Sequence, residues 1–323
     1  MMKRQMEKQA WAIDQGLQVF ERHITSPGQI KHLSQWMDGI VSSLMDSEVV
    51  AALQRIRLQR LLRYLAHRSP FYRQQFAQIG IRPQEMHSLD DLRKFPLTTA
   101  NDIRNWQAFL CVPPERLRAV YTTSGSTGEP KRVYFSERDL RLITNMSALS
   151  LRFLHGTGRL AAMIMLPVGH GLWIAREQAV RTIERAGGLP LPIGTGDPAE
   201  GVKWMQRFEP NLVISSPSHM LALTREAQRQ DYRLVLDTII LGGEMLTDLQ
   251  KGTFAEYWGA RVFDTYGATE IGGGQTIAMP ECTGLTLNEL HLYTEIIDPQ
   301  TGDTAPEGEL VFTTLSREAM PLL

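Results

Sequence analysis

Short apolar runs alternate with longer amphipathic stretches over residues 160–265, and this alternation restricts the fold more than any other feature of the chain. The apolar runs have the length of buried strands, and the stretches between them have the length of helices. Strands are expected at Leu160–Leu166, Leu189–Ile193, Leu212–Ser215, Leu236–Leu241 and Arg261–Thr265, and helices at Trp173–Ala186, Asp197–Phe208, Ser218–Arg229 and Thr247–Trp258. This order is typical of parallel βαβ units, so the sequence predicts an α/β fold with mostly parallel sheets flanked by helices.

Outside residues 160–265, the sequence predicts other kinds of structure at the two ends of the chain. Apolar residues recur at helical spacing from Val49 to Leu65, and we expect the first hundred residues to be helical. Near the C-terminus, Glu295–Asp298 and Glu309–Thr314 flank a turn signal, which predicts a small antiparallel β region. We therefore expect a helical N-terminal portion at 1–110 and an α/β portion at 111–323, together forming one large domain.

Composition excludes several classes of protein. The formal net charge is -1, so no overall field attracts nucleic acid or an anionic membrane, and a phosphate ligand needs a local site. Two cysteines, Cys111 and Cys282, stand far apart and form no CxxC pair, which fits a reducing compartment. The N-terminus lacks the apolar core of a signal peptide, and no apolar run reaches the ~18 residues of a transmembrane helix. A cytoplasmic protein is expected, and a homodimer stays open.

The segment Thr123–Lys131 reads TSGSTGEPK and has the groups needed to hold a polyphosphate. Glycines allow backbone N–H groups to face a ligand, hydroxyls donate further hydrogen bonds, and Lys131 adds a positive charge. The Walker pattern GxxxxGK[ST] is absent, because it requires Gly at Pro130 and Ser or Thr at Arg132. On composition alone, an ordinary surface turn stays open.

The order of these residues resembles the phosphate loop of the adenylate-forming superfamily. Two further motifs follow in the order typical of that superfamily, LGGE at Leu241–Glu244 and DTYGATE at Asp264–Glu270. Further segments are similar to phenylacetate-CoA ligases, namely Ser69–Arg73, Phe95–Thr99, Ser216–Ser218 and Gly308–Leu315. The resemblance implies the large N-terminal domain of such an enzyme. It also implies ATP-dependent activation of a carboxylic acid, aryl or arylacetic, to an acyl-AMP.

The resemblance also implies the ligands and the residues that hold them. The cofactors are ATP, Mg²⁺ and either coenzyme A or the phosphopantetheine of an acyl carrier protein, whose thiol accepts the acyl group. The β- and γ-phosphates would lie against Thr123, Ser124, Gly125, Ser126, Thr127, Gly128 and Lys131. Adenine would lie on Tyr266 and the backbone of Gly243 and Glu244, with Asp264 and Gly267 in the same nucleotide set.

Thr269 would contact the α-phosphate, and Glu270 would bind Mg²⁺, a hard cation that bridges phosphate oxygens. Lys131 and His170 complete the expected catalytic set. His170 follows an expected strand, at the edge where parallel sheets bind ligands, and could orient the substrate carboxylate.

An acid-binding pocket is expected around several residues that could equally be packed in a core. These residues are His170, Trp173, Ser216, Ala268 and Ile271.

Two departures from the family pattern affect what is carried over. The related ligases continue with an RYRTGD segment and a small C-terminal domain that supplies a catalytic lysine, whereas this sequence stops at Leu323. Full turnover by this chain alone is therefore not expected, although nucleotide binding is. The phenylacetate-type pattern also has His where Thr286 stands and Asp where Leu290 stands, which weakens transfer of the substrate.

Two other functions are compatible with parts of the sequence. Gly194–Ala199 fits the GxGxxA dinucleotide pattern, but Asp197 would cap the next helix and repel a pyrophosphate. The stronger alternative is a protein that binds acyl-AMP or acyl thioesters, together with a carrier protein, without activating the acid.

Overall fold

The computed structural model describes residues 2–23, 26, 27, 29, 47–123, 130–156, 158–167, 172–274, 276–278 and 284–323. These residues form two compact units. The first unit contains the described residues within 1–23, 36–142 and 288–323, and the second those within 24–35 and 143–287. These bounds differ from the expected portions 1–110 and 111–323, whose assembly into one large domain stays a prediction.

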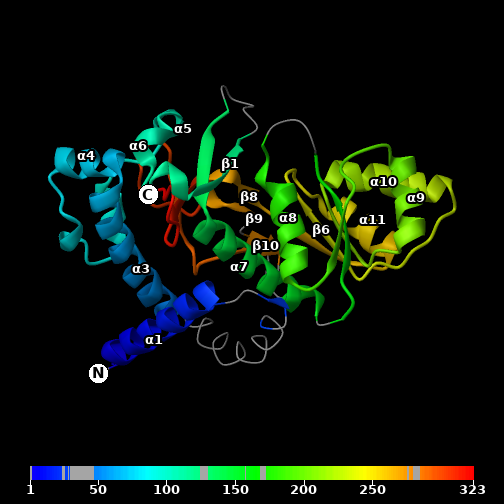
Figure 1. Ribbon diagram of the computed structural model, residues 1–323, viewed down its shortest axis with the longest axis horizontal. Helices are drawn as coiled ribbons and strands as arrows, with labels where there is room; N and C mark the ends of the chain where they lie inside the picture. Colours follow the sequence, from blue (N-terminus) through cyan, green and yellow to red (C-terminus); the bar gives the residue numbers. More distant parts are fainter. Residues whose placement is uncertain are drawn as a thin grey trace. The chain divides into compact units, whose positions relative to one another are not determined.

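A five-stranded parallel sheet forms the centre of the second unit (Figure 1). Its strand order is β4-β3-β5-β6-β7, and every neighbouring pair is parallel. The strands are β3 (Ala161–Met165), β4 (Leu189–Pro192), β5 (Leu212–Ser215), β6 (Thr238–Gly242) and β7 (Arg261–Thr265). The predicted α/β fold is confirmed.

The connecting helices also lie close to their predicted positions. They are α8 (Ile174–Arg185), α9 (Pro198–Phe208), α10 (Pro217–Arg229) and α11 (Asp248–Trp258), and α10 contacts both α9 and α11 (Figure 1). Asp197 caps α9 by accepting a hydrogen bond from the Ala199 amide at 2.9 Å, as the argument against a dinucleotide site required. The amide of Leu236 donates to the Trp258 carbonyl, so β6 begins two residues later than expected.

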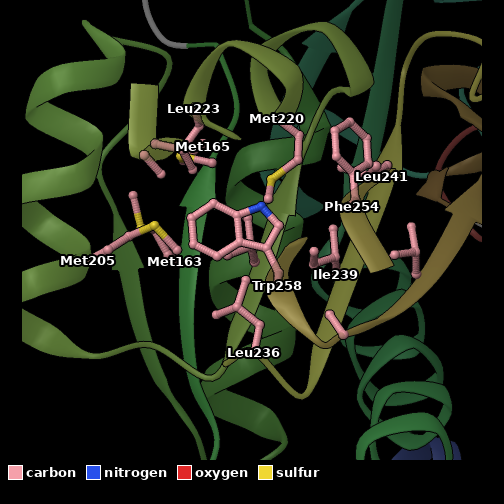
Figure 2. Close-up of a cluster of buried hydrophobic side chains, with 14 of the residues drawn as sticks. Met163, Met165, Met205, Met220, Leu223, Leu236, Ile239, Leu241, Phe254 and Trp258 are labelled. Carbon is pink, nitrogen blue, oxygen red and sulfur yellow. The ribbon is translucent and has the colours of Figure 1, made fainter. Parts of the chain in front are cut away.

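Aliphatic side chains, four methionines, Phe254 and Trp258 form the core beside this sheet (Figure 2). Trp258 is fully buried, and its indole N–H donates to the Thr224 hydroxyl at 2.9 Å. That hydroxyl donates in turn to the Met220 carbonyl at 2.8 Å. The one polar atom of the largest buried side chain therefore has a partner, as burial in an apolar core requires.

Replacing Trp258 with Ala should lower the free energy of unfolding by about 3–5 kcal/mol, because a large buried ring leaves a cavity. Urea denaturation of the purified chain measures this. Trp204→Ala is the matched control, since Trp204 lies on α9 and is 37% exposed. Equal losses in the two variants would contradict the placement of Trp258 at the centre of the core.

Helices and small antiparallel sheets make up the first unit. Helix α1 (Met2–His23) packs on α3 (Ser47–Arg68) through buried apolar side chains, and α4 (Pro70–Ile79), α5 (Ala100–Arg104), α6 (Trp106–Phe109) and α7 (Glu137–His155) follow in the chain. Helix α7 begins in this unit and ends in the second. Strands β12 (Leu292–Ile297) and β13 (Glu309–Thr314) pair antiparallel, which confirms the expected C-terminal β region. No helix within the described ranges is long and apolar enough to cross a membrane.

Two of the phenylacetate-type segments meet the end of the chain in this unit. The Tyr72 hydroxyl accepts a hydrogen bond from the Leu323 amide at 2.8 Å. The Thr98 hydroxyl donates to the Leu323 carbonyl at 2.7 Å. These segments, which had no role assigned from sequence, therefore hold the C-terminal residues against the first unit.

A buried polar network joins α1, α3 and the start of β12. Arg57 donates to the Asp14 carboxylate at 2.9 Å and to the Ser316 hydroxyl at 2.8 Å. The guanidinium nitrogen that donates to Ser316 also lies 3.2 Å from Nδ1 of His291. Because arginine can only donate, Nδ1 accepts and the imidazole proton resides on Nε2. Burial, with Arg57 and Arg138 nearby, lowers the pKa of His291 well below its ordinary value of 6.5.

Stability should therefore fall as the pH drops below about 6.5. The unfolded chain takes up a proton on His291 there, whereas the folded chain does not, so the slope is at most about 1.4 kcal/mol per pH unit for one proton. His291→Asn keeps an acceptor for Arg57 and should flatten the profile measured by denaturation from pH 7 to pH 5. The exposed His67→Asn is the control, and an unchanged slope in His291→Asn would contradict this assignment.

Candidate functional site

The predicted site residues of the second unit follow three neighbouring strands. Ser216 comes directly after β5, Gly243 and Glu244 come after β6, and Tyr266 comes after β7. Because β5, β6 and β7 are parallel neighbours, their carboxyl ends share one edge of the sheet. Ligands of open parallel sheets bind at this edge. The structure therefore brings together residues that lie up to 50 positions apart.

Glu244 reaches from the loop after β6 to the first turn of α10. Its carboxylate accepts hydrogen bonds from the Ser218 amide at 3.0 Å and from the Ser218 hydroxyl at 2.7 Å. Burial lowers the pKa of the adjacent His219, and the Glu244 charge opposes this effect. Neither Ser218 nor His219 was predicted as a site residue, although Ser218 ends one of the phenylacetate-type segments.

The segment after β7 makes a tight turn that depends on glycine. Gly267 and Ala268 form β8 (Gly267–Ala268), which pairs antiparallel with β9 (Gly273–Gly274). A side chain at Gly267 would collide with the backbone carbonyl of Gly273. The Tyr266 side chain, just before this turn, is 43% exposed. The turn therefore fixes the backbone directly after an aromatic ring that is open to solvent.

The acidic and hydroxyl residues of this turn are half-buried. Thr269 and Glu270 lie in a single 3-10 turn (Thr269–Ile271), and Ile271 is buried in the interior. Burial raises the pKa of Asp264 in β7, while the Thr265 amide and Lys251 oppose that shift. The predicted roles of these residues in ligand binding stay predictions.

Gln178 of α8 packs against the same turn and was not predicted from sequence. A Cβ at Gly273, where φ is +89°, would overlap the Gln178 amide oxygen. The Gln178 amide nitrogen donates to the Ser147 hydroxyl at 3.0 Å. Trp173, a predicted pocket residue, directly precedes α8 and is exposed. A lone glutamine within a helix carries no sequence signal for such a contact.

The described ends of the expected phosphate loop, Thr123 and Lys131, lie in the first unit and adjoin two antiparallel strands. Strands β1 (Leu117–Thr122) and β2 (Arg132–Ser136) pair in register up to Thr122 and Arg132. The Thr123 amide donates to the Lys131 carbonyl at 3.1 Å, and the Lys131 amide donates to the Thr123 hydroxyl at 3.1 Å. Hydrogen bonds thus close the loop at its base, and a strand–loop–strand of this kind is not a Walker loop.

Several predicted residues lie outside the described part of the chain. These are Ser124, Gly125, Ser126, Thr127, Gly128 and His170, together with Cys282.

The phosphate oxygens of a bound molecule would have to supply part of the coordination shell of a Mg²⁺ ion at this site. Among the residues that the structure describes, no group of three or more His, Cys, Asp or Glu side chains could hold a metal ion. Magnesium commonly binds through one or two carboxylates, with phosphate oxygens and water completing its shell. A single half-buried carboxylate at Glu270 fits this pattern.

Comparison with known proteins agrees with this architecture. Residues 48–314 match the AMP-binding enzyme family. The chain belongs to this family. Phenylacetate-coenzyme A ligase of Pseudomonas putida is 36% identical over 294 residues, which cover 86% of this chain and 66% of that protein. The Escherichia coli K12 protein of the same name is 32% identical over 298 residues, covering 89% and 67%.

This AMP-binding enzyme also has a well-matched fold among solved structures. A 2-hydroxyisobutyryl-CoA ligase, solved with 2-HIB-AMP and CoA, aligns with a TM-score of 0.78 at 24% identity, covering 86% of this chain and 62% of that one. The structural likeness supports the fold alone. The chain spans about two thirds of the length of the curated relatives it matches.

The Gly267 turn of this AMP-binding enzyme should not tolerate a side chain. Gly267→Ala should separate β8 from β9 and lower the free energy of unfolding by about 2 kcal/mol or more, since the clash is with backbone. Gly252→Ala in α11 is the control, because a Cβ there meets nothing within 4 Å and alanine favours a helix by up to about 1 kcal/mol. Thermal denaturation of both variants measures the difference. A neutral Gly267→Ala would rule out the close approach of the two strands.

Proposed function

We propose that this enzyme activates a carboxylic acid with ATP, releasing pyrophosphate and forming an acyl-AMP, and then transfers the acyl group to the thiol of coenzyme A. Membership of the AMP-binding enzyme family and relatives named phenylacetate-coenzyme A ligase support the reaction. The same relatives support an aryl or arylacetic acid. The observation that carries the proposal is the gathering of Ser216, Gly243, Glu244 and Tyr266 at the carboxyl edge of β5, β6 and β7.

Each residue at this edge then has a chemical task. The exposed Tyr266 ring stacks on adenine, and the backbone of Gly243 and Glu244 lies against the edge of the base. Thr269 donates to the α-phosphate, where the substrate carboxylate attacks. Glu270 would hold Mg²⁺, which would supply positive charge that stabilises the phosphate groups. Most of the rate enhancement then comes from positioning and from charge neutralisation.

The remaining assignments come from the resemblance. The loop from Thr123 to Lys131 holds the β- and γ-phosphates, and the hydrogen bonds at its base support this by fixing where the loop begins and ends. His170 orients the substrate carboxylate. Trp173 and Ala268, with Ser216 and Ile271, line the acid pocket.

The acceptor and the setting are further parts of the proposal. Coenzyme A is favoured over the phosphopantetheine of a carrier protein, because the relatives are named as coenzyme A ligases. We expect the enzyme to work in the cytoplasm, a reducing compartment that suits two cysteines outside any CxxC pair. A homodimer stays open.

Calorimetric titration with non-hydrolysable acyl-AMP analogues tests the proposal. The dissociation constants of benzoyl, anthraniloyl, phenylacetyl and aliphatic analogues should differ, and one aryl analogue should bind most tightly. Tyr266→Ala should weaken that binding by about 5- to 150-fold, equivalent to the roughly 1–3 kcal/mol of one base–aromatic stack. Phe153→Ala is the control, since this exposed ring precedes the amino end of β3 rather than its carboxyl end.

Two outcomes would contradict the proposal. Equal binding by wild type and Tyr266→Ala would remove Tyr266 from the nucleotide site. Tight acyl-AMP binding without ATP–pyrophosphate exchange by the full-length protein would favour the alternative, a protein that binds acyl groups without activating the acid.

A further inference from the structure

The contact between Glu244 and Ser218 joins the loop after β6 to the first turn of α10. Both carboxylate oxygens are used, one by the Ser218 hydroxyl at 2.7 Å and the other by the Ser218 amide at 3.0 Å. The two residues lie 26 positions apart, Glu244 after β6 and Ser218 in the helix that follows β5. We name this contact the Ser218–Glu244 clamp.

A chain of hydroxyl groups extends the clamp to Ser216. The Ser218 hydroxyl lies 3.3 Å from the Ser216 hydroxyl. Because Ser218 donates its proton to Glu244, it accepts the proton of Ser216. Ser216 accepts in turn from the His219 amide at the start of α10. Chains of hydrogen bonds that end on a carboxylate polarise and strengthen one another.

The electrostatic environment at the amino end of α10 favours a carboxylate there. The 13-residue helix α10 has no acidic residue in its own first turn, and Glu244 supplies the negative charge from another loop. The positive end of the helix dipole stabilises that charge. Burial lowers the pKa of the adjacent His219 from its ordinary 6.5, and the Glu244 charge opposes that shift.

The backbone that the clamp holds has little packing of its own. Gly243 is exposed, adopts the left-handed φ of +83°, and has no atom within 4 Å of the position of a Cβ. Met245, on the other side of Glu244, is 86% exposed. The hydrogen bonds of the Glu244 side chain are therefore the described contacts that fix this stretch of the loop.

We infer that Ser218 and Glu244 are positioning residues for the nucleotide. The clamp holds the backbone at 243–244 in the conformation that receives the base, so that binding does not have to order the loop. Ordering a loop on binding costs conformational entropy, and a site that is competent only part of the time binds more weakly in proportion. This inference rests on the proposed function, since it takes the loop after β6 as the nucleotide-binding segment.

A double-mutant cycle measures the clamp directly. Dissociation constants for the best acyl-AMP analogue are compared among wild type, Ser218→Ala, Glu244→Ala and the double variant. Each single change should weaken binding about tenfold, the magnitude of one charge-assisted hydrogen bond. The double variant should bind no more weakly than Glu244→Ala, because Ser218→Ala removes only the hydroxyl hydrogen bond, which Glu244→Ala removes together with the amide hydrogen bond.

Two further variants separate positioning from general loss of structure. Ser218→Thr keeps the hydroxyl and the amide and should restore wild-type affinity, which a loosened fold would not do. Glu256→Ala removes an exposed carboxylate from α11 and should bind like wild type. Hydrogen exchange without ligand gives an independent reading, since amides at 243–246 should exchange faster in Ser218→Ala.

The outcomes distinguish this inference from the proposed function. Tight binding by the wild type with unchanged affinity in Ser218→Ala and Glu244→Ala would overturn the clamp and leave the proposed function standing. Additive losses in the double variant would also overturn it. No binding by the wild type would overturn the proposed function and the positioning role together.

Discussion

The parallel pairing of β5, β6 and β7 is the constraint on which the candidate site depends. Two parallel ladders, β5–β6 and β6–β7, bring the carboxyl ends of these strands to the same edge, so residues far apart in the chain become neighbours. Side-chain contacts then refine what the backbone has already arranged. The Ser218–Glu244 contact joins the helix that follows β5 to the loop that follows β6, and the β8–β9 turn fixes the backbone that follows β7.

Much of this arrangement could be predicted because buried strands and helices have different periods. All five strands of the sheet lie within two or three residues of their expected positions, since each is a short apolar run with a helix-length stretch after it. Helix α7 could not be found in this way. Its apolar residues do form a helical stripe, but the helix precedes the alternation at 160–265 from which the other helices were predicted. Strands β1 and β2 were missed because only part of each is buried.

Motifs indicated which residues of the site matter, but not how they are held. The positions of Gly243, Glu244 and Tyr266 after their strands follow from the motifs and the fold together. The partner of the Glu244 side chain does not follow, because the contact with Ser218 depends on the register between two parallel strands and on the orientation of α10. Gln178 was missed for the same reason, since its role depends on the approach of α8 to Gly273.

The buried Asp14–Arg57 pair has a consequence for how the boundaries of this enzyme should be drawn. The family match begins at residue 48, after α1, yet Arg57 lies within the match and Asp14 lies before it. Leaving out α1 would remove the carboxylate partner of Arg57 and expose the apolar face of α3 that α1 covers, and both changes would destabilise the first unit. A domain boundary placed at the start of the family match would therefore separate the two members of a buried ion pair. The helix before the match belongs to the folded enzyme as much as the residues that define the family.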